Sequence, residues 1–118
     1  MLDLNSVTLA TLQTKTMADF YQGVLGRAPD MVNKEEGFYG WQTGKTYFIV
    51  LEHSEMKGKT RDPGRVMINF ETTQVREEFE RIKALGATVV RAPYQIDKNW
   101  IATLADPDGN YFQLVSPM

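Results

Sequence analysis

Apolar and polar residues alternate along several short stretches of the chain. Such alternation is typical of β-strands that bury one face. It predicts strands over residues 4–11, 38–42, 45–52, 65–71, 87–91, 99–105 and 111–115. Pro29 indicates a further short extended segment at a sheet edge, because proline cannot donate to a strand ladder.

Two other stretches repeat their apolar residues at helical spacing. The first carries Met17, Phe20, Tyr21, Val24 and Leu25, and the second carries Val75, Phe79, Ile82 and Leu85. Thr16 is the expected N-cap of the first helix, and Thr72 or Thr73 that of the second. Gly26 and Gly86 are the expected C-terminal stops.

A hairpin is predicted over residues 104–115. Pro107 and Gly109 suit a tight turn between two strands that are rich in β-forming residues. Gln113 is the polar residue in the middle of the last strand, between Phe112 and Leu114. Its amide either forms hydrogen bonds with a neighbouring side chain such as that of Asn69, or it presents a donor and an acceptor to a ligand.

The two halves of the chain repeat one pattern of strand, helix and three strands. Leu25-Gly26 recurs as Leu85-Gly86, and Tyr47 recurs as Tyr111. We therefore expect an α+β fold of two βαβββ modules forming a cupped mixed sheet with the helices outside. The expected single domain spans 1–118, with module one at 1–53, a polar linker at 54–64 and module two at 65–118. An unrelated α+β sandwich is the alternative.

The composition fits one soluble domain of 118 residues, with 42% hydrophobic and 24% charged residues. The net charge of -2 argues against nucleic acid or a membrane surface as a partner. The chain has no cysteine, which excludes disulfides and thiolate ligands. No apolar run approaches the roughly 20 residues of a membrane span, and no secretory signal is visible, so a cytoplasmic protein is expected.

Three segments together resemble the vicinal oxygen chelate superfamily, which includes glyoxalase I, bleomycin-resistance proteins and extradiol dioxygenases. They are Asp19-Phe20-Tyr21 with Val24-Leu25-Gly26, the run 82–87, and Asp106-Pro107-Asp108-Gly109-Asn110. Their order and spacing match over nearly the whole chain. The resemblance implies a cupped sheet whose first and last strands in each module line the cup, and a homodimer.

The alternation divides the four lining strands into two faces. The face expected against the helices carries Val7, Leu9, Phe48, Val50, Val66, Ile68, Phe70, Phe112 and Leu114. The face expected toward the cup carries Ser6, Thr8, Ala10, Tyr47, Ile49, Leu51, Met67, Asn69, Glu71, Tyr111, Gln113 and Val115. The second face mixes aromatic, apolar and polar groups, as the wall of a ligand pocket does.

Enzymes of the superfamily bind a divalent metal through one His, Glu or Gln on each lining strand. The matched positions here are Ser6 (or Asn5), Ile49, Met67 (or Val66) and Gln113. Isoleucine and methionine do not serve a hard or borderline divalent ion. No metal and no other cofactor is therefore expected at these positions.

The residues proposed to bind a ligand are mainly aromatic, and no catalytic residue is assigned. The proposed set is Tyr39, Trp41, Tyr47, Met67, Asn69, Trp100, Tyr111 and Gln113. Aromatic packing in the core or at a dimer interface is the alternative for the tyrosines and tryptophans. The faces taken by Trp41 and Trp100 are not fixed by the sequence, because bulges are common near such hairpins.

Charged residues offer weaker candidates. His53 is the single histidine and is interpreted as an exposed residue at the start of the linker. Glu71 is expected to be solvated, with a role as a base as the alternative. Arg61, Arg65 and Arg91 could bind an anion at the rim or remain solvated.

The leading hypothesis is a metal-free small-molecule binder, similar to the bleomycin-resistance branch, that holds an aromatic or amphipathic compound. The second is a metal-dependent lyase, isomerase or dioxygenase resembling glyoxalase I, with displaced ligands. The third is a metal-free enzyme that uses Glu71 or a tyrosine as its base.

Overall fold

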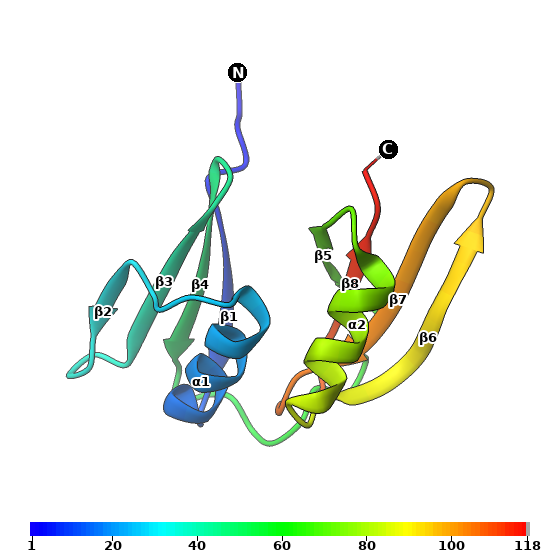
Figure 1. The fold of residues 1–118 in the computed structure, drawn as a ribbon. Coiled ribbons are helices and arrows are strands. Elements are labelled where there is room, and N and C mark those ends of the chain that lie inside the picture. The colour runs from blue at the N-terminus through cyan, green and yellow to red at the C-terminus, as the bar shows by residue number, and fades with distance from the viewer. Residues whose placement is uncertain (118) are drawn as a thin grey trace. The chain divides into compact units, whose positions relative to one another are not determined.

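The computed structural model describes residues 1–117 and contains two compact units, Met1–Gly58 and Lys59–Met118. We call them the first and second modules. Each has one helix and a four-stranded mixed sheet in the order strand, helix and three strands (Figure 1). The predicted α+β fold of two βαβββ modules is confirmed.

The first module contains β1 (Ser6–Thr11), α1 (Thr14–Leu25), β2 (Met31–Asn33), β3 (Phe38–Thr43) and β4 (Thr46–Glu52). Its strands lie in the order β1-β4-β3-β2, with β1 parallel to β4 and the other pairs antiparallel. Met17, Tyr21 and Val24 recur along one side of α1 and are buried. The ring of Tyr21 packs on that of Phe48, with centroids 4.7 Å apart, so α1 covers one face of the sheet.

The second module contains β5 (Ile68–Glu71), α2 (Val75–Ala84), β6 (Thr88–Ile96), β7 (Asn99–Ala105) and β8 (Tyr111–Val115). Its strand order, β5-β8-β7-β6, has the same pattern, with β5 parallel to β8. Helix α2 lies across one face of this sheet (Figure 1) and buries Val75, Phe79 and Ile82. The strand residues Phe112 and Leu104 are fully buried in this module.

Both helices begin without the expected threonine caps. Thr16 lies inside α1, which starts two residues earlier, and Gln13 and Gln74 hold the N-cap positions without a side-chain cap. Instead, Thr11 Oγ1 accepts a hydrogen bond from the Gln13 N–H, and Thr72 Oγ1 accepts one from the Gln74 N–H. These threonines stabilise the turn before each helix rather than its first helical N–H groups.

Strand β5 is shorter than predicted, because it begins at Ile68 rather than at residue 65. Val66 and Met67 therefore precede the strand, and Val66 is 70% exposed. The Arg65 N–H donates to the Asp62 carbonyl in a turn that precedes the strand. The expectation that Val66 packs beneath the helix is wrong.

Strand β6 is longer than predicted and continues through Pro93 to Ile96. It is the edge strand of its sheet and pairs only with β7. Two register shifts interrupt that pairing, one between Val89 and Arg91 and one between Arg91 and Tyr94. Proline is tolerated at such bulges on edge strands, because its missing N–H breaks no ladder bond.

The turn from β7 to β8 forms around the buried carboxylate of Asp106, which is 5% exposed. Asp106 Oδ1 accepts hydrogen bonds from the backbone N–H groups of Asp108 at 2.9 Å and Asn110 at 3.0 Å. The Asn110 side chain donates to the same carboxylate. The predicted hairpin is confirmed, and this network fixes the register that places Gln113. No helix among the described residues is long and apolar enough to cross a membrane.

Candidate functional site

A row of four polar side chains crosses the face of the second sheet that is turned away from α2. Strand pairing aligns Asn69 with Gln113, Gln113 with Thr103, and Thr103 with Arg91. The row runs from β5 through β8 and β7 to β6. We call this face the open face and these four residues the polar row.

Alternation along β8 positions the row. Phe112 and Leu114 are 0% and 3% exposed and point to the helix side, so Gln113 between them points to the open face. Its Nε2 donates to Thr103 Oγ1 at 2.9 Å. Within the described part of the chain, Gln113 Oε1 forms no hydrogen bond. A half-buried amide oxygen is thus free to accept a hydrogen bond from a ligand.

The two bulges of β6 bring Arg91 to the row. The first bulge puts Val89 opposite Leu104, on the helix side, and Arg91 opposite Thr103, on the open face. The second puts Tyr94 opposite Ile101 on that same open face. The Arg91 guanidinium carbon lies 3.6 Å from the Tyr94 ring centroid, in a cation–π contact.

A second, mostly apolar row lies beside the polar row. Pairing aligns Glu71 with Val115, Val115 with Ile101, and Ile101 with Tyr94. Val115, Ile101 and Tyr94 are half-buried, whereas Glu71 is exposed at the β5 edge. The open face therefore combines polar groups with a narrow apolar strip.

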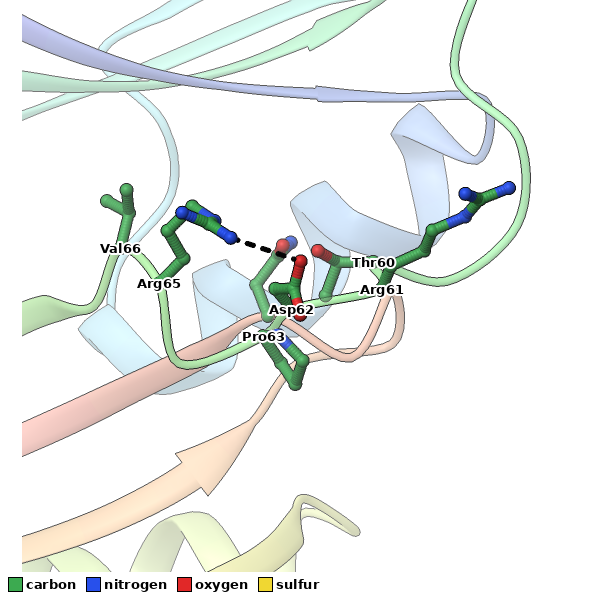
Figure 2. A pocket seen from close by; sticks show the side chains of 7 residues that line it. Thr60, Arg61, Asp62, Pro63, Arg65 and Val66 are labelled. Carbon is green, nitrogen blue, oxygen red and sulfur yellow. Dashed lines mark hydrogen bonds and ion pairs between the residues drawn. The ribbon is translucent and has the colours of Figure 1, made fainter.

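A surface hollow lies at the Tyr111 end of the second module. One lobe of about 280 Å³ is lined by Thr60, Arg61, Asp62, Pro63, Arg65, Val66 and Asn110. Figure 2 shows Arg65 turned toward Asp62, at 3.4 Å, and Arg61 pointing away from both. All three side chains are exposed, so this ion pair contributes little to stability.

The predicted ligand-binding residues divide between the faces of their sheets. Asn69 and Gln113 lie in the polar row, and Tyr111 lies one row away on the open face. Tyr47 lies on the corresponding face of the first sheet, away from α1. Met67 lies before β5 and outside any strand, with 42% of its surface exposed.

The other three predicted residues lie on the helix sides of their sheets. Trp41 is 0% exposed, and its indole Nε1 donates to the Arg27 carbonyl at 3.0 Å, which is a core role. Trp100 stacks under the guanidinium of Arg76 from α2, 4.7 Å from the ring centroid. Tyr39 lines a surface hollow of about 330 Å³ beside the N-terminus of α1. Trp100 therefore lies on the opposite face of its sheet from Gln113, and Trp41 and Tyr39 belong to the first module.

The matching face of the first sheet has different chemistry. Pairing aligns Thr8 with Ile49, Ile49 with Gly40, and Gly40 with Met31. In the first sheet, this row takes the positions that the polar row takes in the second sheet. One module therefore presents a mostly apolar row, with the Thr8 hydroxyl at one end, where the other presents amides, a hydroxyl and a guanidinium.

The sequence of the chain matches a known protein family. A family model described as a glyoxalase-like domain matches residues 6–115. The chain belongs to the glyoxalase-like domain family. The predicted resemblance to the vicinal oxygen chelate superfamily is thereby confirmed. No curated protein matches the chain.

Solved structures share the fold over nearly the whole chain. A glyoxalase/bleomycin resistance protein/dioxygenase family enzyme from Burkholderia phytofirmans PsJN is 26% identical, with a TM-score of 0.77 over 99% of this chain and 100% of that one. A glyoxalase-related enzyme from Fulvimarina pelagi is 19% identical, with a TM-score of 0.81 over 99% and 89%. TioX from Micromonospora sp. ML1 is 18% identical, with a TM-score of 0.77 over 98% and 99%. The last two likenesses show the fold alone.

The metal positions of the superfamily do not carry a fitting donor set in this glyoxalase-like chain. The positions that the resemblance assigns to the metal ligands are Ser6 (or Asn5), Ile49, Met67 (or Val66) and Gln113. They offer only hydroxyl and neutral amide oxygens, together with thioether and alkyl groups. Borderline divalent ions prefer imidazole and carboxylate. No group of three or more His, Asp or Glu residues within residues 1–117 is arranged to hold a metal.

His53 is exposed, as predicted. Its side-chain Nδ1 accepts a hydrogen bond from the backbone N–H of Glu55 at 3.1 Å. The backbone N–H of His53 donates to the Thr11 carbonyl. These bonds are local turn contacts at the end of β4.

The sequence did not single out Thr103 or Tyr94 as site residues. Their alternation places them on one face only once the strand pairing and bulges of β6 are known. The sequence predicts Arg91 only as one of three candidate anion-binding arginines.

Proposed function

We propose that this glyoxalase-like protein binds a small aromatic or amphipathic compound without a metal ion, and that the open face of the second module holds it. The proposal rests on the polar row. It offers amide, hydroxyl and guanidinium groups side by side, next to the apolar strip of Ile101 and Val115. Small-molecule sites combine few polar groups with apolar surface in this manner.

Gln113 is the central group of the proposed site. Its Nε2 is fixed by Thr103, so the free Oε1 is held in one direction rather than left to rotate. Fixing a polar group before binding reduces the entropy that binding must overcome. The donor set at the superfamily's metal positions supports binding without a metal, because it lacks imidazole and carboxylate.

Two-dimensional ¹H–¹⁵N NMR of protein treated with EDTA tests this function. A library of flat aromatic and amphipathic compounds would be added to the labelled protein. We expect some compounds to shift the side-chain amide signals of Gln113 and Asn69, because both groups lie in the row. A library that leaves these signals unchanged would overturn the proposal.

Two leucine variants make the test specific. Gln113→Leu removes the amide from the polar row, whereas Gln95→Leu makes the same change on β6 opposite Trp100, away from the open face. We expect Gln113→Leu to weaken binding roughly 2- to 12-fold, as the loss of one hydrogen bond does. Gln95→Leu should leave binding unchanged, and equal losses in both variants would contradict the assignment.

We also propose a homodimer, which the family resemblance implies. Multi-angle light scattering coupled to gel filtration tests it. A mass near twice 13.4 kDa is expected, and a mass of one chain at micromolar concentration would refute it.

A further inference from the structure

We propose that the ligand of the open face carries a carboxylate, and that Arg91, held against the ring of Tyr94, receives it. This inference rests on the proposed function and narrows its ligand to aromatic or amphipathic acids. Four observations support it: the free N–H edge of the Arg91 guanidinium, the neighbours of that group, the distribution of charge on the open face, and the bulges of β6.

The guanidinium of Arg91 is available to a ligand. Within residues 1–117, no acidic side chain pairs with it, and its described contact is the ring of Tyr94 at 3.6 Å. A contact through the face of the guanidinium leaves its N–H edge free. That edge matches a planar carboxylate in a two-point hydrogen bond.

The neighbours of Arg91 complete a site for an acid. Thr103 is aligned with Arg91, is 5% exposed and holds the Gln113 side chain through its hydroxyl, and Gln113 lies next in the row. The half-buried side chains of Ile101 and Val115 form the adjacent strip, where the apolar body of the ligand would lie. A carboxylate at Arg91 and a ring on this strip would occupy neighbouring positions on one face.

The charges on the open face set the orientation of the ligand. Arg91 lies on the edge strand β6, and Glu71 lies on the opposite edge strand β5. Three strand spacings separate these edges, or roughly 14 Å. The carboxylate of Glu71 repels an acid at its own edge, so the acid group is directed to Arg91.

The bulges of β6 support a binding role for this strand. A regular strand would put Arg91 and Tyr94 on opposite faces, and the second bulge puts them on the same face. Bulges that redirect side chains are over-represented beside functional sites. The pairing of a cation with an aromatic ring at this point is thus a product of the strand's irregularity.

A matched pair of probes tests the inference. The probes are 2-naphthoate and 2-naphthamide, which share a ring system and differ in charge at neutral pH. Affinities would be measured from the NMR shifts of the Gln113 side-chain amide and the Ile101 and Val115 backbone amides. We expect wild-type protein to bind the acid at least about tenfold more tightly than the amide, because charge-assisted hydrogen bonds exceed neutral ones.

Two arginine variants identify the group responsible. Arg91→Gln should abolish the preference for the acid, because the charge that would pair with the carboxylate is gone. Arg76→Gln removes the same charge from the helix side of the sheet, at Trp100, and should keep the preference. An unchanged preference in Arg91→Gln, or equal binding of both probes to wild type, would overturn the inference.

The outcomes also separate this inference from the proposed function. If neutral aromatic compounds shift Gln113 but acids do not bind more tightly, the site stands and the assignment of an acid falls. If no compound of the library or the pair shifts the open face, both proposals fall. A preference for the acid that appears without shifts at Gln113 would place the site elsewhere and contradict both.

Discussion

The Arg91 guanidinium stacks on the ring of Tyr94, although the two residues are three positions apart on one strand. An odd separation points side chains to opposite faces of a regular strand. The register shift between them restores a common face. A strand defect therefore creates the one cation–aromatic pair described on the open face of the second module.

Tyr94 positions Arg91 for an acid, which leads to a first prediction. Tyr94→Leu should weaken 2-naphthoate binding about two- to fivefold, because an exposed cation–π contact is worth roughly 0.5–1 kcal/mol. Tyr94→Phe retains the ring face and should bind like wild type. The measurement is the same NMR titration, and a larger loss in the phenylalanine variant than in the leucine variant would show that the hydroxyl, not the ring, matters.

Asp106 organises the turn that sets the register of β8. In Asp106→Ala, the N–H groups of Asp108 and Asn110 lose their acceptor, so the variant should lose about 1–3 kcal/mol of unfolding free energy. Asp106→Asn keeps one oxygen acceptor and should lose less. Urea unfolding followed by circular dichroism measures both, and an alanine variant as stable as wild type would refute the role.

Gly37 and Gly58 offer a matched test of backbone strain in the first module. Both have positive φ, at 64° and 61°, but a Cβ on Gly37 would lie 2.7 Å from Glu52 Cβ, whereas one on Gly58 would meet open space. Gly58→Ala should cost about 1–2 kcal/mol, the penalty of the left-handed conformation alone. Gly37→Ala should cost more, and equal losses of stability in thermal unfolding of the two variants would contradict a role for this contact.

Asp30 should make the stability of the first module depend on pH. The backbone N–H of Gln42 and the Arg27 guanidinium hydrogen-bond to its carboxylate and hold its pKa below the ordinary value of an aspartate. A lowered pKa stabilises the fold above the unfolded-state value, and this contribution is lost as the pH falls through the folded-state pKa. Asp30→Asn should therefore lower stability at pH 7 and differ less from wild type below pH 3 in urea unfolding. A difference that is equal at both pH values would contradict this.

Much of the fold was predictable because its signals are local. Periods of two and about 3.6 identified the strands and helices. Gly26 ends α1 as predicted, and it does so in the left-handed conformation. The alternation in β8 correctly placed Gln113 on the opposite face of the sheet from Phe112 and Leu114, since the hairpin turn fixed the register of this strand. Pro93 misled the prediction for β6, because the sequence does not reveal that this strand is an edge with bulges.

The candidate site was less predictable because it depends on pairing between distant strands. The sequence predicts Asn69 and Gln113 on one face, but Thr103 and Tyr94 join them there only through the register of β7 with β8 and β6. The orientations of Trp41 and Trp100 likewise follow from their partners Phe48 and Gln95. An aromatic residue looks the same in a sequence whether it faces a helix or a ligand.

Metal content measured together with binding tests the central claim most directly. Untagged protein purified without chelators would be analysed by elemental mass spectrometry, and its affinity for an aromatic compound that shifts Gln113 would be measured before and after EDTA treatment. The account predicts well under one equivalent of Ni, Zn, Fe and Mn and the same affinity in both samples. One equivalent of any of these metals, with binding lost on chelation, would contradict it and favour a metal-dependent glyoxalase-like enzyme.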